Sequence, residues 1–367
     1  MENPIDIQKQ FFHPVCNARE IERVFDVKDA DDYLLKLRAE TIVDHMRLFR
    51  VYRNKALRDE KNWSLENSFD TSHYERFLDR LCDDDRRQCL ETTFGDMFSN
   101  DPNGSVFATE HGPIITISSS LQFFLNFAHL ALMPFTSEIP EHVELNGLRI
   151  AMRVMLSTEA LDFYMDPRGI LPRDVGEGIH TPLPLQMQFI AGHEFAHHVL
   201  GHLNDSNTSM KPVYFAISSK EDDYKPIKTY NRSQQEEFEA DVQAILLPDY
   251  PDKEIGELLH AALLWFGALE LYEAVSDEIF PVSPGSYQTH PTARDRFDNL
   301  LTKIPTPDGF STDDAKRFLG TVDFYKRVLL DDVCSNLDLY EFYGSVYLDA
   351  PNTEWRGPEL VDRVDYY

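Results

Sequence analysis

The sequence predicts a mainly helical α+β protein, and four stretches carry this prediction. Apolar residues recur at helical spacing in LQMQFIAGHEFAHHVLGHL (185–203), which contains no proline, and in ADDYLLKLRAETIVDHMRLFRVYRNKAL (30–57). SVFAT (105–109) and IITIS (114–118) are instead rich in residues that favour strands, and the EHGP between them is typical of a hairpin turn. We therefore expect many helices around a β-hairpin or small sheet.

Composition narrows the class of protein. The chain has 367 residues, and its 25 Phe and 16 Tyr indicate a globular protein with a large core. Its formal net charge of −28 argues against a nucleic acid partner, because the phosphates would be repelled. The four cysteines have no CxxC spacing, so we expect free thiols.

The sequence also predicts a protein without stable membrane insertion. The N-terminal MENPIDIQKQFF lacks the basic start and the apolar stretch of a signal peptide. The two most apolar runs, at 121–135 and 258–271, are shorter than the ~20 residues that cross a bilayer, and each contains polar residues. We expect both to be buried helices of a cytoplasmic protein.

The most informative stretch is HEFAHHVLGH (193–202), which contains an HExxH pattern. On a helix, residues four apart lie about 40° from each other, so His193 and His197 project from one face with Glu194 beside them. Two imidazoles at this spacing can bind zinc, and the carboxylate can take a proton from zinc-bound water. The pattern is short enough to occur by chance, so a further ligand is needed.

The other two histidines of the stretch are not expected to be ligands. By the same helical arithmetic His198 and His202 lie about 140° and 180° from His193, so we expect packing or hydrogen-bonding roles. The pattern HExxHxxGxxH is not met either, because Leu200 and Leu203 stand where it requires glycine and histidine.

EEFEADVQA (236–244) offers the missing ligand on a second expected helix. Glu237 and Asp241 are four residues apart, and Ala240 and Ala244 would let this helix approach another closely. One carboxylate can bind zinc while the other accepts the free ring N–H of a ligand histidine. An exposed acidic helix face is the alternative. Two partial motifs in one chain favour a site for one Zn²⁺, held by His193, His197 and Glu237.

These motifs resemble those of gluzincin metallopeptidases. HEFAHHVLGH followed by EFEADVQA is similar to the HExxHxxxxH and ExxxD of the CaaX prenyl proteases and heat-shock membrane proteases. THPTARDRF (289–297) resembles their later THP…R motif, with His290, Pro291 and Arg296 at matching positions. That group is embedded in the membrane. The soluble phage-exclusion Lit peptidases, which are latent proteases that cut a translation factor, are the more similar relatives.

The resemblance covers about residues 105–300 and implies a zincin-like fold. We expect a helical N-terminal region at 1–100, a zincin-like metalloprotease domain at 101–305, and a helical C-terminal region at 306–367 packed on the core. The IITIS strand would be the edge strand that pairs with an extended substrate. The polar segment 204–233 would cover the cleft until an activating protein or peptide moves it.

The resulting hypothesis is a zinc-dependent endopeptidase that hydrolyses a protein or peptide substrate, with phage defence as the role that the Lit resemblance implies. Glu194 would act as general base and then as proton donor, and Asp241 would orient a ligand histidine. His290 would stabilise the developing oxyanion, or would only start a helix, and Arg296 would anchor its segment to a carboxylate. The alternatives are a catalytically silent binding or regulatory protein on a zincin scaffold, which the retention of Glu194 argues against, and a hydrolase of small substrates.

Overall fold

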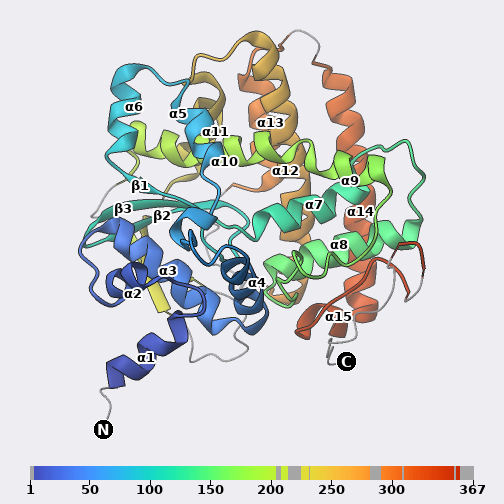
Figure 1. The fold of residues 1–367 in the computed structure, drawn as a ribbon. Helices are drawn as coiled ribbons and strands as arrows, with labels where there is room; N and C mark the ends of the chain where they lie inside the picture. Colours follow the sequence, from blue (N-terminus) through green and yellow to red (C-terminus); the bar gives the residue numbers. More distant parts are fainter. Residues whose placement is uncertain are drawn as a thin grey trace.

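The computed structural model describes residues 4–203, 208–213, 225–230, 232–281, 291–307, 310–350 and 353–355. The N-terminal helices are α1 (Pro4–Phe12), α2 (Ala18–Phe25), α3 (Ala30–Asp44), α4 (Met46–Arg58), α5 (Ser72–Leu78) and α6 (Asp83–Leu90), with a 3₁₀ turn, η1 (Glu66–Ser68). The central helices are α7 (Leu121–Leu132), α8 (Glu141–Met155), α9 (Arg173–His180), α10 (Leu183–Val199), α11 (Gln234–Leu246) and α12 (Asp252–Ile279). The remaining helices are α13 (Ala293–Lys303), α14 (Thr312–Asn336) and α15 (Asp338–Glu341). The prediction of a mainly helical α+β protein is confirmed (Figure 1).

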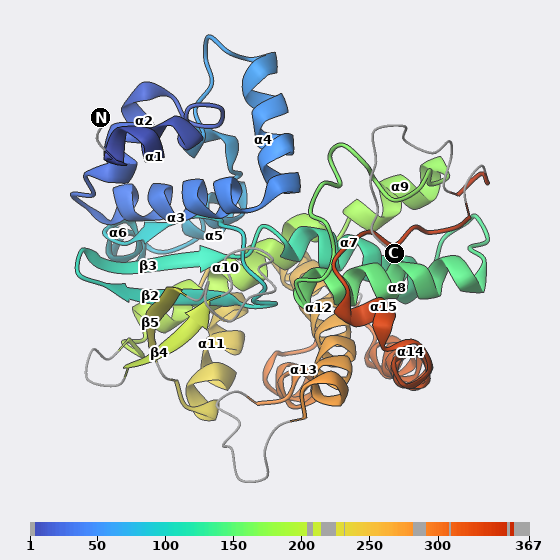
Figure 2. The same cartoon turned by 90° about the horizontal axis from the view of Figure 1, so that it is seen from below.

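One five-stranded sheet separates α2 and α3 from α10 and α11, and α5 and α6 lie on the same side of the sheet as α10 (Figures 1 and 2). Its strands are β1 (Thr93–Phe94), β2 (Gly104–Thr109), β3 (Gly112–Ile117), β4 (Thr208–Val213) and β5 (Lys225–Tyr230), in the order β1-β3-β2-β5-β4. β1 is parallel to β3, and the other pairs are antiparallel. The predicted hairpin is β2–β3, with Thr109 opposite Gly112.

Two expectations about the sheet are wrong. The IITIS strand is not an edge strand, because β3 pairs with β1 on one side and with β2 on the other. The segment 204–233 is not only a polar loop, since it contributes β4 and β5. Each strand contains a proline, and a proline argues against a strand when only the sequence is read. The two prolines, Pro212 and Pro226, lie opposite each other in the sheet.

Alternating side chains of β3 reach opposite faces of the sheet. Ile114 packs with Leu34 and Leu37 of α3 in a small cluster, whereas Ile115 and Ile117 belong to the main core. The main core runs from Phe12 to Trp355 and includes residues of all three regions expected from the sequence. These regions therefore share one core.

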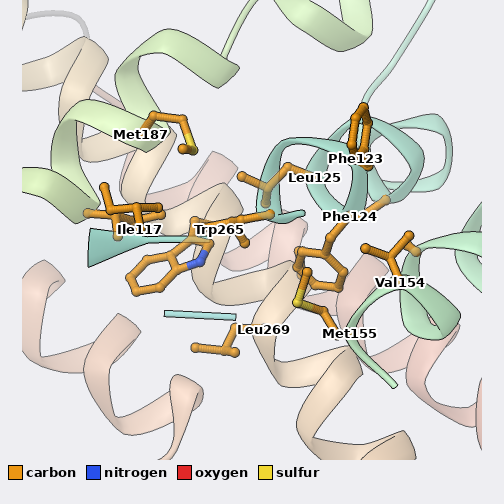
Figure 3. Packing of buried hydrophobic residues seen from close by; sticks show 14 of the residues in the cluster. Ile117, Phe123, Phe124, Leu125, Val154, Met155, Met187, Trp265 and Leu269 are labelled. Atoms are coloured by element: carbon orange, nitrogen blue, oxygen red, sulfur yellow. The ribbon is translucent and has the colours of Figure 1, made fainter. Parts of the chain in front are cut away.

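The helix α12 forms the centre of this core. Its Trp265 and Leu269 lie among side chains of β3, α7, α8 and α10, including Phe124 and Met155 (Figure 3). The helix has 28 residues, longer than the apolar run 258–271 suggested. Within the described part of the chain, α12 alone has the length and composition to cross a membrane, and 72% of its most apolar stretch is buried inside the protein.

A candidate metal centre between two helices

The helices α10 and α11 pack side by side and carry the two sequence motifs. Ala244 of α11 faces Gly192 of α10, where an added Cβ would be in ordinary contact at 3.4 Å, and the glycine itself is required by the Phe77 ring of α5, which a Cβ would meet at 2.6 Å. Ser233 starts α11 with a capping box: its side chain accepts a hydrogen bond from the backbone of Glu236, whose carboxylate accepts one in return. This cap fixes where α11 begins and therefore which face presents Glu237.

The side chains of His193, His197 and Glu237 converge in a buried cluster that could hold a metal ion. The Nε2 atoms of the two histidines are 3.1 Å apart. The carboxylate oxygens of Glu237 lie 3.4 Å from Nε2 of His193 and 3.5 Å from Nε2 of His197. Metal–ligand bonds of about 2.0–2.2 Å in a tetrahedron place neighbouring ligand atoms roughly 3.3–3.6 Å apart. The distance between the two imidazole nitrogens, and the distance from each of them to its nearer Glu237 oxygen (Oε2 for His193, Oε1 for His197), are therefore each close to one edge of a tetrahedral site.

A buried carboxylate and guanidinium lie behind His193. Asp241 Oδ1 is 2.9 Å from His193 Nδ1, and Arg296 of α13 donates to both carboxylate oxygens of Asp241 at 2.6 and 2.8 Å. The Arg296 guanidinium also lies 5.0 and 4.8 Å from the ring centres of Trp265 and Phe266. With Nδ1 facing Asp241, the lone pair on Nε2 of His193 can face the ligand cluster.

His202 contacts the second ligand histidine, His197, at its Nδ1 atom, the same ring atom that faces Asp241 in His193. Its Nδ1 lies 3.0 Å from Nδ1 of His197. α10 ends at Val199 rather than continuing to 203, because Gly201 adopts a φ of 75° that turns the chain back toward the helix. The helical angle calculated for His202 therefore does not apply. His198 lies elsewhere, with Nε2 3.1 Å from the hydroxyl of Thr92.

Glu194 lies beside the cluster without belonging to it. Its Oε1 is 4.0 Å from His193 Nε2, is buried, and accepts no hydrogen bond from the described residues. Its Oε2 accepts a hydrogen bond of 2.7 Å from Arg232, whose other terminal nitrogen is 3.7 Å from Glu237. Gly104, at the start of β2, packs directly against the Glu194 carboxylate.

The surroundings give the two ligand histidines opposite pKa shifts. Burial disfavours the charged form of His193, but the carboxylates of Asp241 and Glu237 outweigh it and raise the pKa to about 9. Burial, Arg232 and the neighbouring His193 hold the pKa of His197 well below its usual value. Metal binding to His193 would therefore release a proton.

The structure brings together most of the residues predicted from sequence. His193, Glu194, His197, Glu237, Asp241 and Arg296 form one buried group. His290 lies outside the described residues. Sequence reasoning did not find Arg232, which has no motif around it, and it assigned no role to His202 at the ligand histidines. The sequence signals for His202 were the glycine that precedes it and its place as the last histidine of HExxHxxxxH.

The fold and the site define a mainly helical α+β protein with a buried two-histidine, one-carboxylate centre that could hold a metal ion. Comparison with protein-family models, with curated proteins and with solved structures finds no match to this chain. The function is therefore inferred from the residues of the site.

Proposed function

We propose that the protein is a zinc-dependent peptidase with a zincin-like core at residues 101–305. The observation that carries the proposal is the position of Glu194. A buried carboxylate oxygen that accepts no hydrogen bond from the described residues lies beside two histidines and a glutamate that could hold a metal ion. A purely structural metal site needs no such extra carboxylate.

The donor set suits zinc. Two imidazole nitrogens and one carboxylate oxygen are the protein ligands of a common type of catalytic zinc site, which keeps a further position open. Asp241 and His202 would orient the two imidazoles through their Nδ1 atoms. Bound there, zinc would polarise the scissile carbonyl and lower the pKa of a coordinated water.

The chain's own residues would then move the proton. Glu194 accepts a proton at Oε1 from the attacking water and delivers it to the nitrogen of the leaving amine. Arg296 and Asp241 remain fixed behind His193, because both are buried and paired with each other. They keep the ligand histidine in one orientation throughout the reaction.

The resemblance to gluzincin peptidases supports a narrower proposal. On that basis the protein is a cytoplasmic, Lit-like endopeptidase that acts on a protein substrate, with a translation factor in phage defence as the candidate. The motif segments that carry the resemblance on described residues, 193–202, 236–244 and 291–297, meet at one site.

One observation favours a second candidate, a catalytically silent binding protein on the same scaffold. Arg232 occupies one oxygen of Glu194. A carboxylate oxygen that already accepts a hydrogen bond from a guanidinium is not available to an attacking water. In that case the metal would serve only to hold the fold.

Metal analysis of the purified protein, followed by comparison of the proteomes of cells expressing the wild type and Glu194→Gln, tests the proposal. We expect about one zinc per chain in both proteins and new protein fragments only with the wild type. Zinc in both with identical proteomes would favour the silent scaffold. Absence of zinc from both would overturn the metal centre.

A further inference from the structure

Arg232 is a buried cation that lies next to the metal centre, in contact with Glu194. Its side chain is 7% exposed and lies between the end of β5 and the start of α11. Its terminal nitrogens face Glu194 at 2.7 Å and Glu237 at 3.7 Å. Its Nε is buried and donates no hydrogen bond to the described residues.

The charges of the site explain why a guanidinium can be held there. Three buried carboxylates, those of Glu194, Glu237 and Asp241, lie within one group. Arg296 pairs with Asp241 on the far side of His193. Without Arg232, the Glu194 carboxylate would lose the guanidinium that bonds to it at 2.7 Å, and a buried carboxylate without such a partner is costly in a protein interior.

We propose that Arg232 is an internal counter-cation that holds Glu194 and Glu237 in the metal-free protein and gives them up when a divalent metal binds. The inference rests on the proposed metal centre and concerns its regulation. A dication at the ligand cluster would bring a second positive charge close to Arg232. The metal would take Glu237 as a ligand, so the two cations compete for that carboxylate, and their repulsion would weaken the contact of Arg232 with Glu194.

Competition of this kind couples the site to the sheet. Arg232 follows β5 by two residues, and the described part of β5 meets β2 at the pair Phe107 and Thr229.

Zinc binding to charge variants tests the inference directly. Arg232→Met removes the charge, Arg232→Gln also removes it but keeps a donor for Glu194, and Arg232→Lys keeps the charge. Arg149→Met is the matched control, because Arg149 pairs with Asp332 at 2.8 Å in another part of the protein. Zinc affinity is measured by competition with a chromophoric chelator, and the thermal midpoint is measured with and without zinc.

We expect Arg232→Met and Arg232→Gln to bind zinc ~10-fold or more tightly than the wild type, since a nearby positive charge is gone. Their metal-free forms should unfold at lower temperature, and zinc should raise their midpoints more than that of the wild type. Arg232→Lys should resemble the wild type. Arg149→Met should lose stability without a change in zinc affinity.

The outcomes separate this inference from the proposed metal centre. Equal or weaker zinc binding by both uncharged variants overturns the role of Arg232 while leaving the centre intact. Failure of every protein, including the wild type, to bind zinc overturns the centre and the inference together. If Arg232→Met does not fold, Arg232→Gln decides the result, because its amide can still bond to Glu194.

Discussion

Arg296 donates two hydrogen bonds to the carboxylate of Asp241, which lies 55 residues earlier in the sequence. Asp241 in turn faces Nδ1 of His193 at 2.9 Å. This series of contacts links α13, α11 and α10, so the orientation of His193 depends on the packing of three helices. The arrangement places a fixed negative charge behind the ring without using it as a ligand.

We expect Asp241→Asn to weaken zinc binding ~10- to 100-fold, because the amide removes the charge that supports His193. The variant should also be less stable, by about 3–5 kcal/mol, since Arg296 would be left buried without its anion. Isothermal titration with zinc and chemical denaturation measure the two effects. Unchanged zinc affinity would show that Asp241 serves only the fold.

The acids of α11 should differ sharply in their effect on zinc. Glu237→Ala should remove most bound zinc, because Glu237 lies in the ligand cluster. Glu239→Ala should retain it, since this side chain is 48% exposed and no closer than 3.7 Å to His202. Glu236→Ala should also retain zinc but lose about 1 kcal/mol of stability with the capping box. Zinc content after dialysis ranks the variants; a loss confined to Glu239→Ala would contradict the assignment.

Glu194→Gln should keep zinc and lose hydrolysis. The amide cannot accept a proton, and loss of a general base typically lowers the rate by ~10²–10⁴. Zinc content and cleavage of a generic protein substrate are measured on the same preparation. Undiminished cleavage by this variant would exclude the proposed role of Glu194.

Local patterns allowed the helices and the ligand spacing to be predicted. The periodicity of α10 and the four-residue spacing of His193 and His197 depend only on helix geometry, and the β2–β3 hairpin depends on adjacent residues. The mainly helical α+β class followed from the same local signals.

The features that sequence did not reveal depend on contacts between distant segments. β4 and β5 form by pairing at the sheet edge although each contains a proline. Arg232 reaches Glu194 only because β5 lies beside β2, and no single stretch of sequence records that relationship. His202 is a local exception: it reaches His197, five residues earlier, because α10 ends at Val199 and Gly201 turns the chain back.

Acid should destabilise the protein through buried neutral histidines. Burial lowers the pKa of His129 and of His45 to about 4. The unfolded chain, with an ordinary value near 6.5, takes up these protons first. Each histidine therefore leaves stability intact above about pH 6.5 and reduces it as the pH falls toward 4, by about 3 kcal/mol at most.

Denaturation with urea at several pH values measures this loss. His129→Leu should show a shallower fall in stability between pH 6.5 and 4 than the wild type, because one of the titrating histidines is gone. An identical slope in the two proteins would mean that His129 does not titrate on unfolding in this range.

The position of Glu194 can be tested without changing its chemistry. Gly104 begins β2, and a Cβ added there would lie 2.7 Å from Glu194 Oε1, closer than real contacts allow. Gly104→Ala should therefore displace the carboxylate from the side of His193. His193, His197 and Glu237 are untouched, so zinc content should remain normal while hydrolysis falls ~10-fold or more, as expected for a misplaced general base.

Gly320→Ala in α14 is the matched control, because a Cβ there meets nothing within 4 Å. The control should keep both zinc and activity. Full activity in Gly104→Ala, with zinc bound and the fold intact, would show that the reaction does not depend on the position of Glu194 described here.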